Sequence, residues 1–148
     1  MDTYSTLNNY KKLEVTSTNR LNLVVMLYDA AIASLKQAQE CHQRNDLIKR
    51  NSFVSRAQLI ITEMNNSLNM EQGKEIAETL SKIYNFLNRH LNEVNTDNDI
   101  HKVGQALNIL INLSDAWKEI AGKTEKKSVS TPTEDAAANS GRGNSFYG

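Results

Sequence analysis

The side chains best suited to metal or nucleophilic chemistry in this chain are three histidines and one cysteine, Cys41. A carboxylate-histidine metal site in a helical bundle needs a glutamate three residues before a histidine on each of two helices. No histidine here has that glutamate. The residues at that position are Gln39 before His42, Leu87 before His90 and Asn98 before His101. The sequence therefore predicts no metal site.

Nucleophilic chemistry has no better support in the sequence. Cys41 and His42 are adjacent, so they point in different directions from a helix. No residue near Cys41 supplies a base, and a free cysteine more often packs as a small apolar group. The chain also has no phosphate-binding loop and no G-x-S-x-G turn. We expect no catalytic residue and no cofactor, and we expect the histidines to face solvent.

The charge of the chain is balanced, with 17 Lys+Arg against 17 Asp+Glu. A neutral chain lacks the electrostatic means to hold nucleic acid or anionic lipid. Two basic pairs, Lys49 with Arg50 and Lys126 with Lys127, are too small for a DNA-reading helix, and we expect them to be solvated surface. The longest apolar run, Leu23 to Leu27, is far shorter than the ~20 residues of a membrane span. These features predict neither nucleic-acid binding nor membrane insertion.

The elements that must position any site are helices. Apolar residues recur every three or four positions in four blocks, and short polar breaks separate the blocks. The blocks span about Thr18–Cys41, Asp46–Leu68, Gly73–Val94 and Asp99–Ala121. The only proline, Pro132, lies after all of them. Four helices of similar length with short connections predict an all-α antiparallel four-helix bundle.

Three segments follow from this pattern. Residues 1–16 are expected to be a flexible N-terminal segment, residues 17–122 the bundle, and residues 123–148 a polar, aperiodic and disordered tail. Ser17 is the expected N-cap of the first helix and Gly122 the expected end of the last. The single cysteine and the absence of a signal-like start predict a cytoplasmic protein.

The spacing of apolar residues also predicts one core stripe for each helix. Tyr28 and Trp117 fall on these stripes, and we expect them to be structural. The predicted stripes are Leu21, Val25, Tyr28, Ile32 and Leu35; Phe53, Ala57, Ile60, Met64 and Leu68; Ile76, Leu80, Ile83 or Tyr84, Leu87 and Leu91; and Ile100, Val103, Leu107, Leu110, Ser114 and Trp117.

Two helices have more apolar surface than one stripe can use. The last has a second line through Ile109, Leu113, Ala116 and Ile120, and the run Leu23 to Leu27 is apolar around the whole first helix. Either a broad core or a self-dimer buries this excess, or an amphipathic helix of a partner binds there.

The N-terminal segment has its own periodicity. Tyr4, Leu7, Tyr10 and Leu13 recur every third residue, so a short helical turn would align them along one side. Such a segment is suited to lying on an apolar groove.

Several segments between about Tyr4 and Ile120 match segments of one known protein family, in the same order along the chain. They are Thr16-Ser17-Thr18-Asn19-Arg20-Leu21, Val25-Met26-Leu27-Tyr28-Asp29-Ala30-Ala31-Ile32, Leu68-Asn69-Met70-Glu71-Gln72-Gly73-Lys74-Glu75-Ile76-Ala77, Ile83-Tyr84-Asn85-Phe86-Leu87-Asn88-Arg89-His90-Leu91, Asn98-Asp99 and Asp115-Ala116-Trp117-Lys118. This series resembles the FliS family, the flagellin-specific export chaperones of bacteria.

The resemblance implies a four-helix bundle that binds the C-terminal segment of flagellin on apolar surface, prevents premature polymerisation and delivers flagellin to the export apparatus. It also implies that the N-terminal segment can occupy part of this surface when flagellin is absent, and our hypothesis is that Leu7 and Tyr10 cap the groove until flagellin displaces them. We expect the groove to be lined by Ile61, Ile83, Phe86, Ile109, Leu113 and Ile120.

Further partners of some family members are an export gate, an anti-sigma factor or a co-chaperone, for which the sequence has no recognisable motif. The alternative function is a self-associating helical adaptor that handles no client and forms a homodimer through the same surface. The sequence leaves the role of Asp29 open between a solvent-facing carboxylate and a group that orients a partner.

Overall fold

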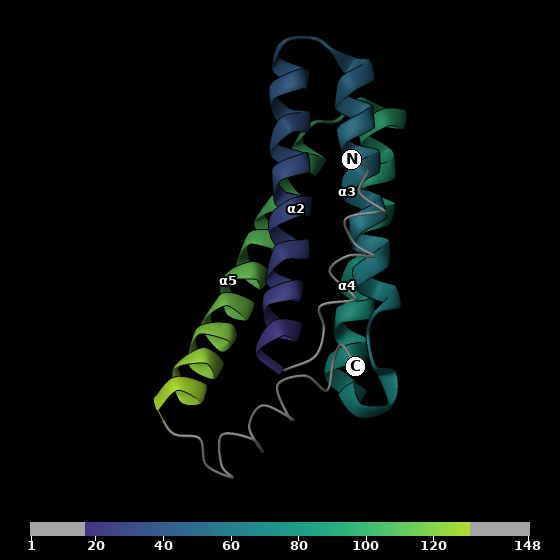
Figure 1. Ribbon diagram of the computed structural model, residues 1–148. Helices are drawn as coiled ribbons and strands as arrows, with labels where there is room; N and C mark the ends of the chain where they lie inside the picture. The colour runs from purple at the N-terminus through teal and green to yellow at the C-terminus, as the bar shows by residue number, and fades with distance from the viewer. Residues whose placement is uncertain (1–16, 131–148) are drawn as a thin grey trace.

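The computed structural model describes residues 17–130, and within them the side chains of residues 20–69 and 73–123. Four helices follow one another along these residues with short connections: α2 (Ser17–Gln43), α3 (Leu47–Asn66), α4 (Met70–Asp97) and α5 (His101–Ser130). The described residues contain no strand. The prediction of an all-α four-helix bundle is confirmed (Figure 1).

The helices pack unequally. Helix α2 packs most extensively against α3 and α5, α3 also packs against α4, and the α4–α5 contact is the smallest of the four. In Figure 1, α5 diverges from α2 toward its C-terminal end. The edge between α4 and α5 is therefore the least closed part of the bundle.

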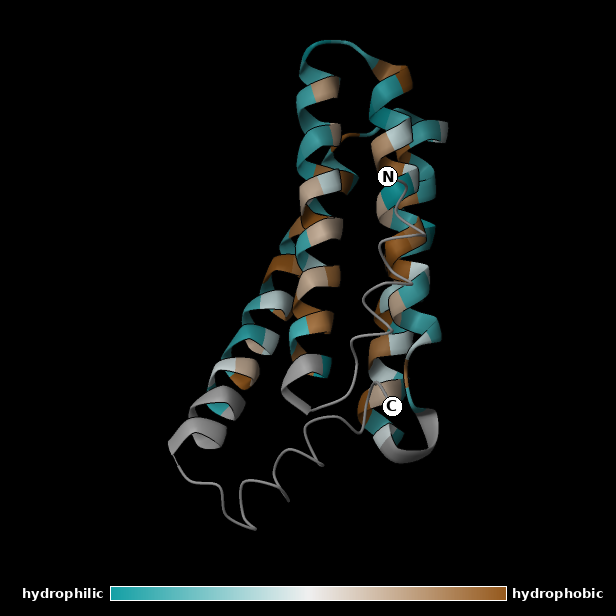
Figure 2. Ribbon diagram, in the orientation of Figure 1, coloured by the Kyte–Doolittle hydropathy of each residue, from teal (hydrophilic) through white to brown (hydrophobic). Residues whose placement is uncertain are grey.

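The core consists of side chains from all four helices, and Figure 2 shows hydrophobic and hydrophilic positions alternating along each helix. Tyr28 and Trp117 are buried, as predicted. One residue of the predicted stripes is misplaced, because Ile76 is 51% exposed while its neighbour Ala77 is fully buried. The phase of α4 is set by its buried residues from Leu80 onward, and that phase turns Ala77 rather than Ile76 toward the core.

The α2–α3 turn is closed by two backbone hydrogen bonds. The Asp46 N–H donates to the Cys41 carbonyl at 2.8 Å and the Asn45 N–H to the His42 carbonyl at 3.0 Å. Asn45 has a φ of 58°, and asparagine tolerates this left-handed conformation better than most residues. The Asp46 carboxylate then caps α3 by accepting from the Lys49 N–H at 3.2 Å. Two adjacent residues thus end one helix and start the next.

Two predicted helix ends are wrong. Ser17 is already helical rather than an N-cap, and α5 continues past Gly122 to Ser130. No described glycine has a positive φ, so Gly122 does not adopt the left-handed conformation that ends many helices. Residues 123–127 are rich in Lys and Glu, which favour helix. The predicted tail therefore begins inside a helix, while the segment predicted for residues 1–16 lies outside the described residues.

The expected surface position of Arg50 is also wrong. Arg50 is 2% exposed. Its Nη1 donates to His42 Nδ1 at 3.0 Å and to Asn98 Oδ1 at 2.6 Å, so one guanidinium links the α2–α3 turn to the α4–α5 turn. Its Nε donates to Asn51 Oδ1 at 3.0 Å. Lys49 next to it is exposed, as predicted.

Candidate functional site

Helix α4 presents three large apolar side chains on the side toward α5. Ile76, Ile83 and Phe86 are spaced by seven and three residues, so they share one face of the helix. Ile76 is 51% and Phe86 42% exposed, and Ile83 is half-buried against the core. Ordinary surface helices place polar residues on such a face.

Helix α5 presents a matching line. Ile109, Leu113 and Ile120 are spaced by four and seven residues. The first two pack partly against the core, and Ile120 is 37% exposed. The second apolar line predicted for this helix therefore lies at the surface of the bundle.

One hydrogen bond and two ion pairs between α4 and α5 fix how these lines face each other. His90 Nε2–H donates to Gln105 Oε1 at 2.5 Å, and Lys102 forms ion pairs with Glu93 and, at 3.5 Å, with Asp97.

The helices are antiparallel, so each step back along α4 from His90 matches a step forward along α5 from Gln105. This register places Phe86 level with Ile109, Ile83 level with Leu113 and Ile76 level with Ile120. We call these six residues the α4–α5 strip.

The chemistry of the strip is that of apolar burial. All six side chains are uncharged hydrocarbons, and covering them releases roughly 25 cal/mol per Å² of apolar surface removed from water. A strip of apolar side chains along two antiparallel helices fits the apolar face of a third helix. The strip is therefore suited to binding another chain.

The strip contains five of the six residues that were predicted to line a groove. The sixth, Ile61, is fully buried, so its predicted surface position is wrong. Helix α3 packs against both α2 and α4, and both Ile60 and Ile61 are buried. Ile76 was missed because it was assigned to the core, although its spacing of seven from Ile83 was visible in the sequence. Leu7 and Tyr10, the predicted cap, lie outside the described residues.

The side where α3 meets α4 has a different character. Neutral amides bridge the two helices along this side. Asn51 donates to Asn95 at 2.8 Å, Gln58 to Asn92 at 2.7 Å and Asn65 to Asn85 at 3.0 Å. These groups satisfy one another, so this row of amides offers little apolar area to a partner.

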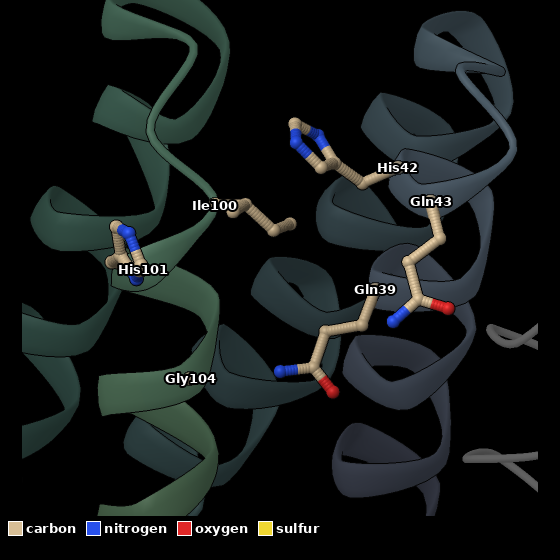
Figure 3. Close-up of a pocket in the computed structure, with 6 residues that line it drawn as sticks. All are labelled: Gln39, His42, Gln43, Ile100, His101 and Gly104. Carbon is tan, nitrogen blue, oxygen red and sulfur yellow. The ribbon is translucent and has the colours of Figure 1, made fainter.

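A pocket of about 310 Å³ lies between the end of α2 and the start of α5. Gln39 and Gln43 extend from α2 toward α5, where Gly104 leaves room, and Ile100 lies between the two histidines of the lining (Figure 3). The residues that line the pocket are Gln39, His42, Gln43, Ile100, His101 and Gly104. They include no carboxylate or thiol, so the pocket offers amide and imidazole hydrogen bonds only.

Other groups with chemical potential are engaged in structure. Cys41 is buried, and its Sγ accepts from Arg44 Nη2 at 3.8 Å. Asp29, whose role the sequence left open, pairs with Lys118 across α2 and α5 at 3.1 Å. Among the described side chains, no group of three or more His, Cys, Asp or Glu is placed to hold a metal ion. No helix in the described part of the chain has the length and apolar character to span a membrane.

Curated relatives share most of their length with this chain. It is 32% identical over 110 residues to the flagellar secretion chaperone FliS of Salmonella typhimurium, covering 74% of this chain and 82% of that protein. It is 27% identical over 113 residues to FliS of Campylobacter jejuni, covering 76% and 88%. It is 26% identical over 118 residues to FliS of Bacillus subtilis, covering 80% and 86%. With its helical-bundle fold, the chain belongs to the class of flagellar export chaperones.

The family model described as flagellar protein FliS matches residues 3–124, which include all four helices up to the C-terminal part of α5. The chain is a member of the FliS family. The resemblance drawn from the sequence is confirmed, and the relatives are named as secretion chaperones.

Proposed function

We propose that the chain binds the C-terminal segment of flagellin on the α4–α5 strip in the cytoplasm, keeps it from polymerising early and delivers it to the flagellar export apparatus. The observation that carries the proposal is the exposure of Ile76, Phe86 and Ile120 along one edge of the bundle. Apolar area of this kind marks binding sites for other chains. The family membership supplies the export role.

The proposed mechanism is binding coupled to folding. A terminal segment that is disordered when free loses conformational entropy when it becomes helical, so burial on the strip must exceed that cost. The strip is hydrocarbon, and affinity should therefore depend on buried area and little on salt. A negative heat-capacity change accompanies such burial.

The N-terminal segment is proposed to compete for the same surface. Leu7 and Tyr10 would cover the strip when flagellin is absent and leave it when flagellin binds. Deleting residues 1–15 should then raise the affinity for flagellin. Unchanged or weaker binding by the shortened chain would count against this cap.

The test of the proposed function is calorimetric titration with a peptide of the last forty or so residues of flagellin, followed in parallel by circular dichroism. We expect one-to-one binding with a gain of helicity. The variant Phe86→Glu should weaken binding at least tenfold, because it puts a charge on the strip. The matched control is Leu59→Glu, since Leu59 is 46% exposed on α3, outside the strip.

Two results would contradict the proposal. Equal loss of binding in the two glutamate variants would show that the strip is not the site. No binding by the folded chain, together with a dimer at micromolar concentration in analytical ultracentrifugation, would favour self-association through the strip.

A further inference from the structure

The α4–α5 strip ends abruptly at one level of the bundle. One helical turn beyond Phe86 and Ile109, the facing residues are His90 and Gln105, which are hydrogen-bonded to each other at 2.5 Å. About one turn further, Glu93 and Lys102 form an ion pair. Along one edge the surface therefore changes from hydrocarbon to neutral polar and then to charged.

His90 and Gln105 are held firmly at this boundary. The His90 ring stacks on the Phe86 ring, with the centroids 5.0 Å apart and the planes 22° from parallel. Its Nε2–H donates a hydrogen bond to Gln105. Gln105 is exposed, so the rest of its amide is accessible to water. An apolar side chain laid over this pair would strip water from its polar atoms without replacing those hydrogen bonds, which is unfavourable.

A bound helix needs such a boundary because an apolar strip by itself specifies register poorly. Sliding an amphipathic helix by one turn, about 5.4 Å, replaces one set of apolar contacts by a similar set. In coiled coils, a polar residue within an apolar seam fixes the register at some cost in affinity. It acts by penalising the wrong alignments more than the right one.

We infer that His90 and Gln105 are the specificity-determining residues that fix the register of the bound segment along the α4–α5 strip. The pair ends the apolar contacts one turn after Phe86 and excludes alignments that slide toward Lys102. The inference rests on the proposed function, because it assigns the alignment of the flagellin segment bound there.

The test replaces the polar boundary by apolar residues in the variant His90→Leu with Gln105→Leu. The matched control is Thr96→Leu with Asn108→Leu, which adds leucines at exposed, neutral positions of the same two helices. The probe is a flagellin C-terminal peptide that carries a photo-crosslinking residue at one apolar position. Mass spectrometry of the crosslinked product identifies the level of the strip that this residue contacts.

The unaltered chain and the control should crosslink at one level. The boundary variant should give an additional product shifted by three or four residues toward Lys102. A second peptide carries leucine at the first polar position after its apolar face. The boundary variant should bind this second peptide at least tenfold more tightly than it binds the parent peptide. The same replacement should weaken binding to the unaltered chain, because the leucine would then cover the polar atoms of His90 and Gln105.

Identical crosslinks and identical peptide preferences in the variant and the unaltered chain would overturn the inference while leaving the proposed function intact. Failure of the unaltered chain to bind the parent peptide would overturn the proposed function itself. Circular dichroism verifies that each variant is folded. If the double variant is unfolded, the single variant Gln105→Leu is tested in its place. Gln105 is exposed, so its replacement leaves the core unchanged.

Discussion

The phenolic oxygens of Tyr28 and Tyr84 lie 2.5 Å apart in the centre of the bundle, where α2 and α4 face each other across the core. Both side chains are fully buried, and their rings are tilted by 53° with centroids 6.4 Å apart. A hydrogen bond between two buried hydroxyls satisfies a polar atom on each helix at once. It also links two helices that are not one of the four directly packed pairs.

Replacing both tyrosines should therefore cost less than the two single replacements added together. Tyr28→Phe removes this hydrogen bond and should lower the free energy of unfolding by about 0.5–1.5 kcal/mol. The double variant with Tyr84→Phe should lose less than the sum of the two single variants, because both single variants lose the same shared hydrogen bond. Urea denaturation of the four chains measures this coupling. Additive losses would show that the two hydroxyls act independently.

Arg50 should contribute to stability far more than its neighbour Lys49. Arg50→Leu deprives His42, Asn51 and Asn98 of their donor and should lower the free energy of unfolding by about 1–3 kcal/mol. Lys49→Leu is the control, because Lys49 is exposed, and it should change stability by less than about 0.5 kcal/mol. Thermal and urea denaturation provide the comparison. Equal effects would contradict the role of Arg50 in joining the two turns.

Gly122→Ala should stabilise the protein. Gly122 lies inside α5, and a Cβ added there would meet no atom within 4 Å. Alanine in a helix interior is more favourable than glycine by roughly 0.5–1 kcal/mol. Gly104→Ala makes a useful comparison, because its Cβ would lie 3.8 Å from Gln39 Nε2, an ordinary contact. A raised melting temperature for Gly122→Ala is expected, and a lowered one would argue against helix at this position.

Lys74→Gly should also stabilise the protein, because Lys74 has an unusual backbone. Its φ of 46° and ψ of −121° interrupt the first part of α4. This conformation is strained for a residue with a side chain and accessible to glycine. The expected gain is about 1 kcal/mol. Lys82→Gly, at an exposed and regular position of the same helix, should instead lose about 1 kcal/mol. Loss of stability in both variants would show that Lys74 carries no strain.

The sequence predicted the number and order of the helices because their apolar spacing is strong and their connections are short. It misplaced Arg50 because the residue was considered only for its charge. Its position four before Val54 and seven before Ala57 puts it on the buried face of α3, and that spacing was a readable signal. Composition indicates what a side chain is, whereas the helical phase indicates where it lies.

The candidate site was predicted less completely than the fold, for two physical reasons. A helix between two neighbours buries a wide arc, so Ile60 and Ile61 are both enclosed and periodicity alone cannot select the exposed one. The pairing of α4 with α5 depends on contacts between residues distant in sequence, such as His90 with Gln105, which no local pattern reveals. The sequence analysis placed Ile83 and Phe86 in one groove with Ile109 and Leu113, but it did not give the level at which the two helices face each other.

The contacts that fasten the helices differ in kind, and ionic strength should separate them. Neutral amides join α3 to α4, whereas α5 is tied by ion pairs to α4 through Lys102 and to α2 through Lys118, in addition to the His90–Gln105 hydrogen bond. Dissolved salt screens exposed charges and has little effect on amide hydrogen bonds. Concentrated salt should therefore loosen α5 more than it loosens the three helices before it. Helix α5 carries half of the α4–α5 strip, and its packing against the other helices should therefore depend on the salt concentration.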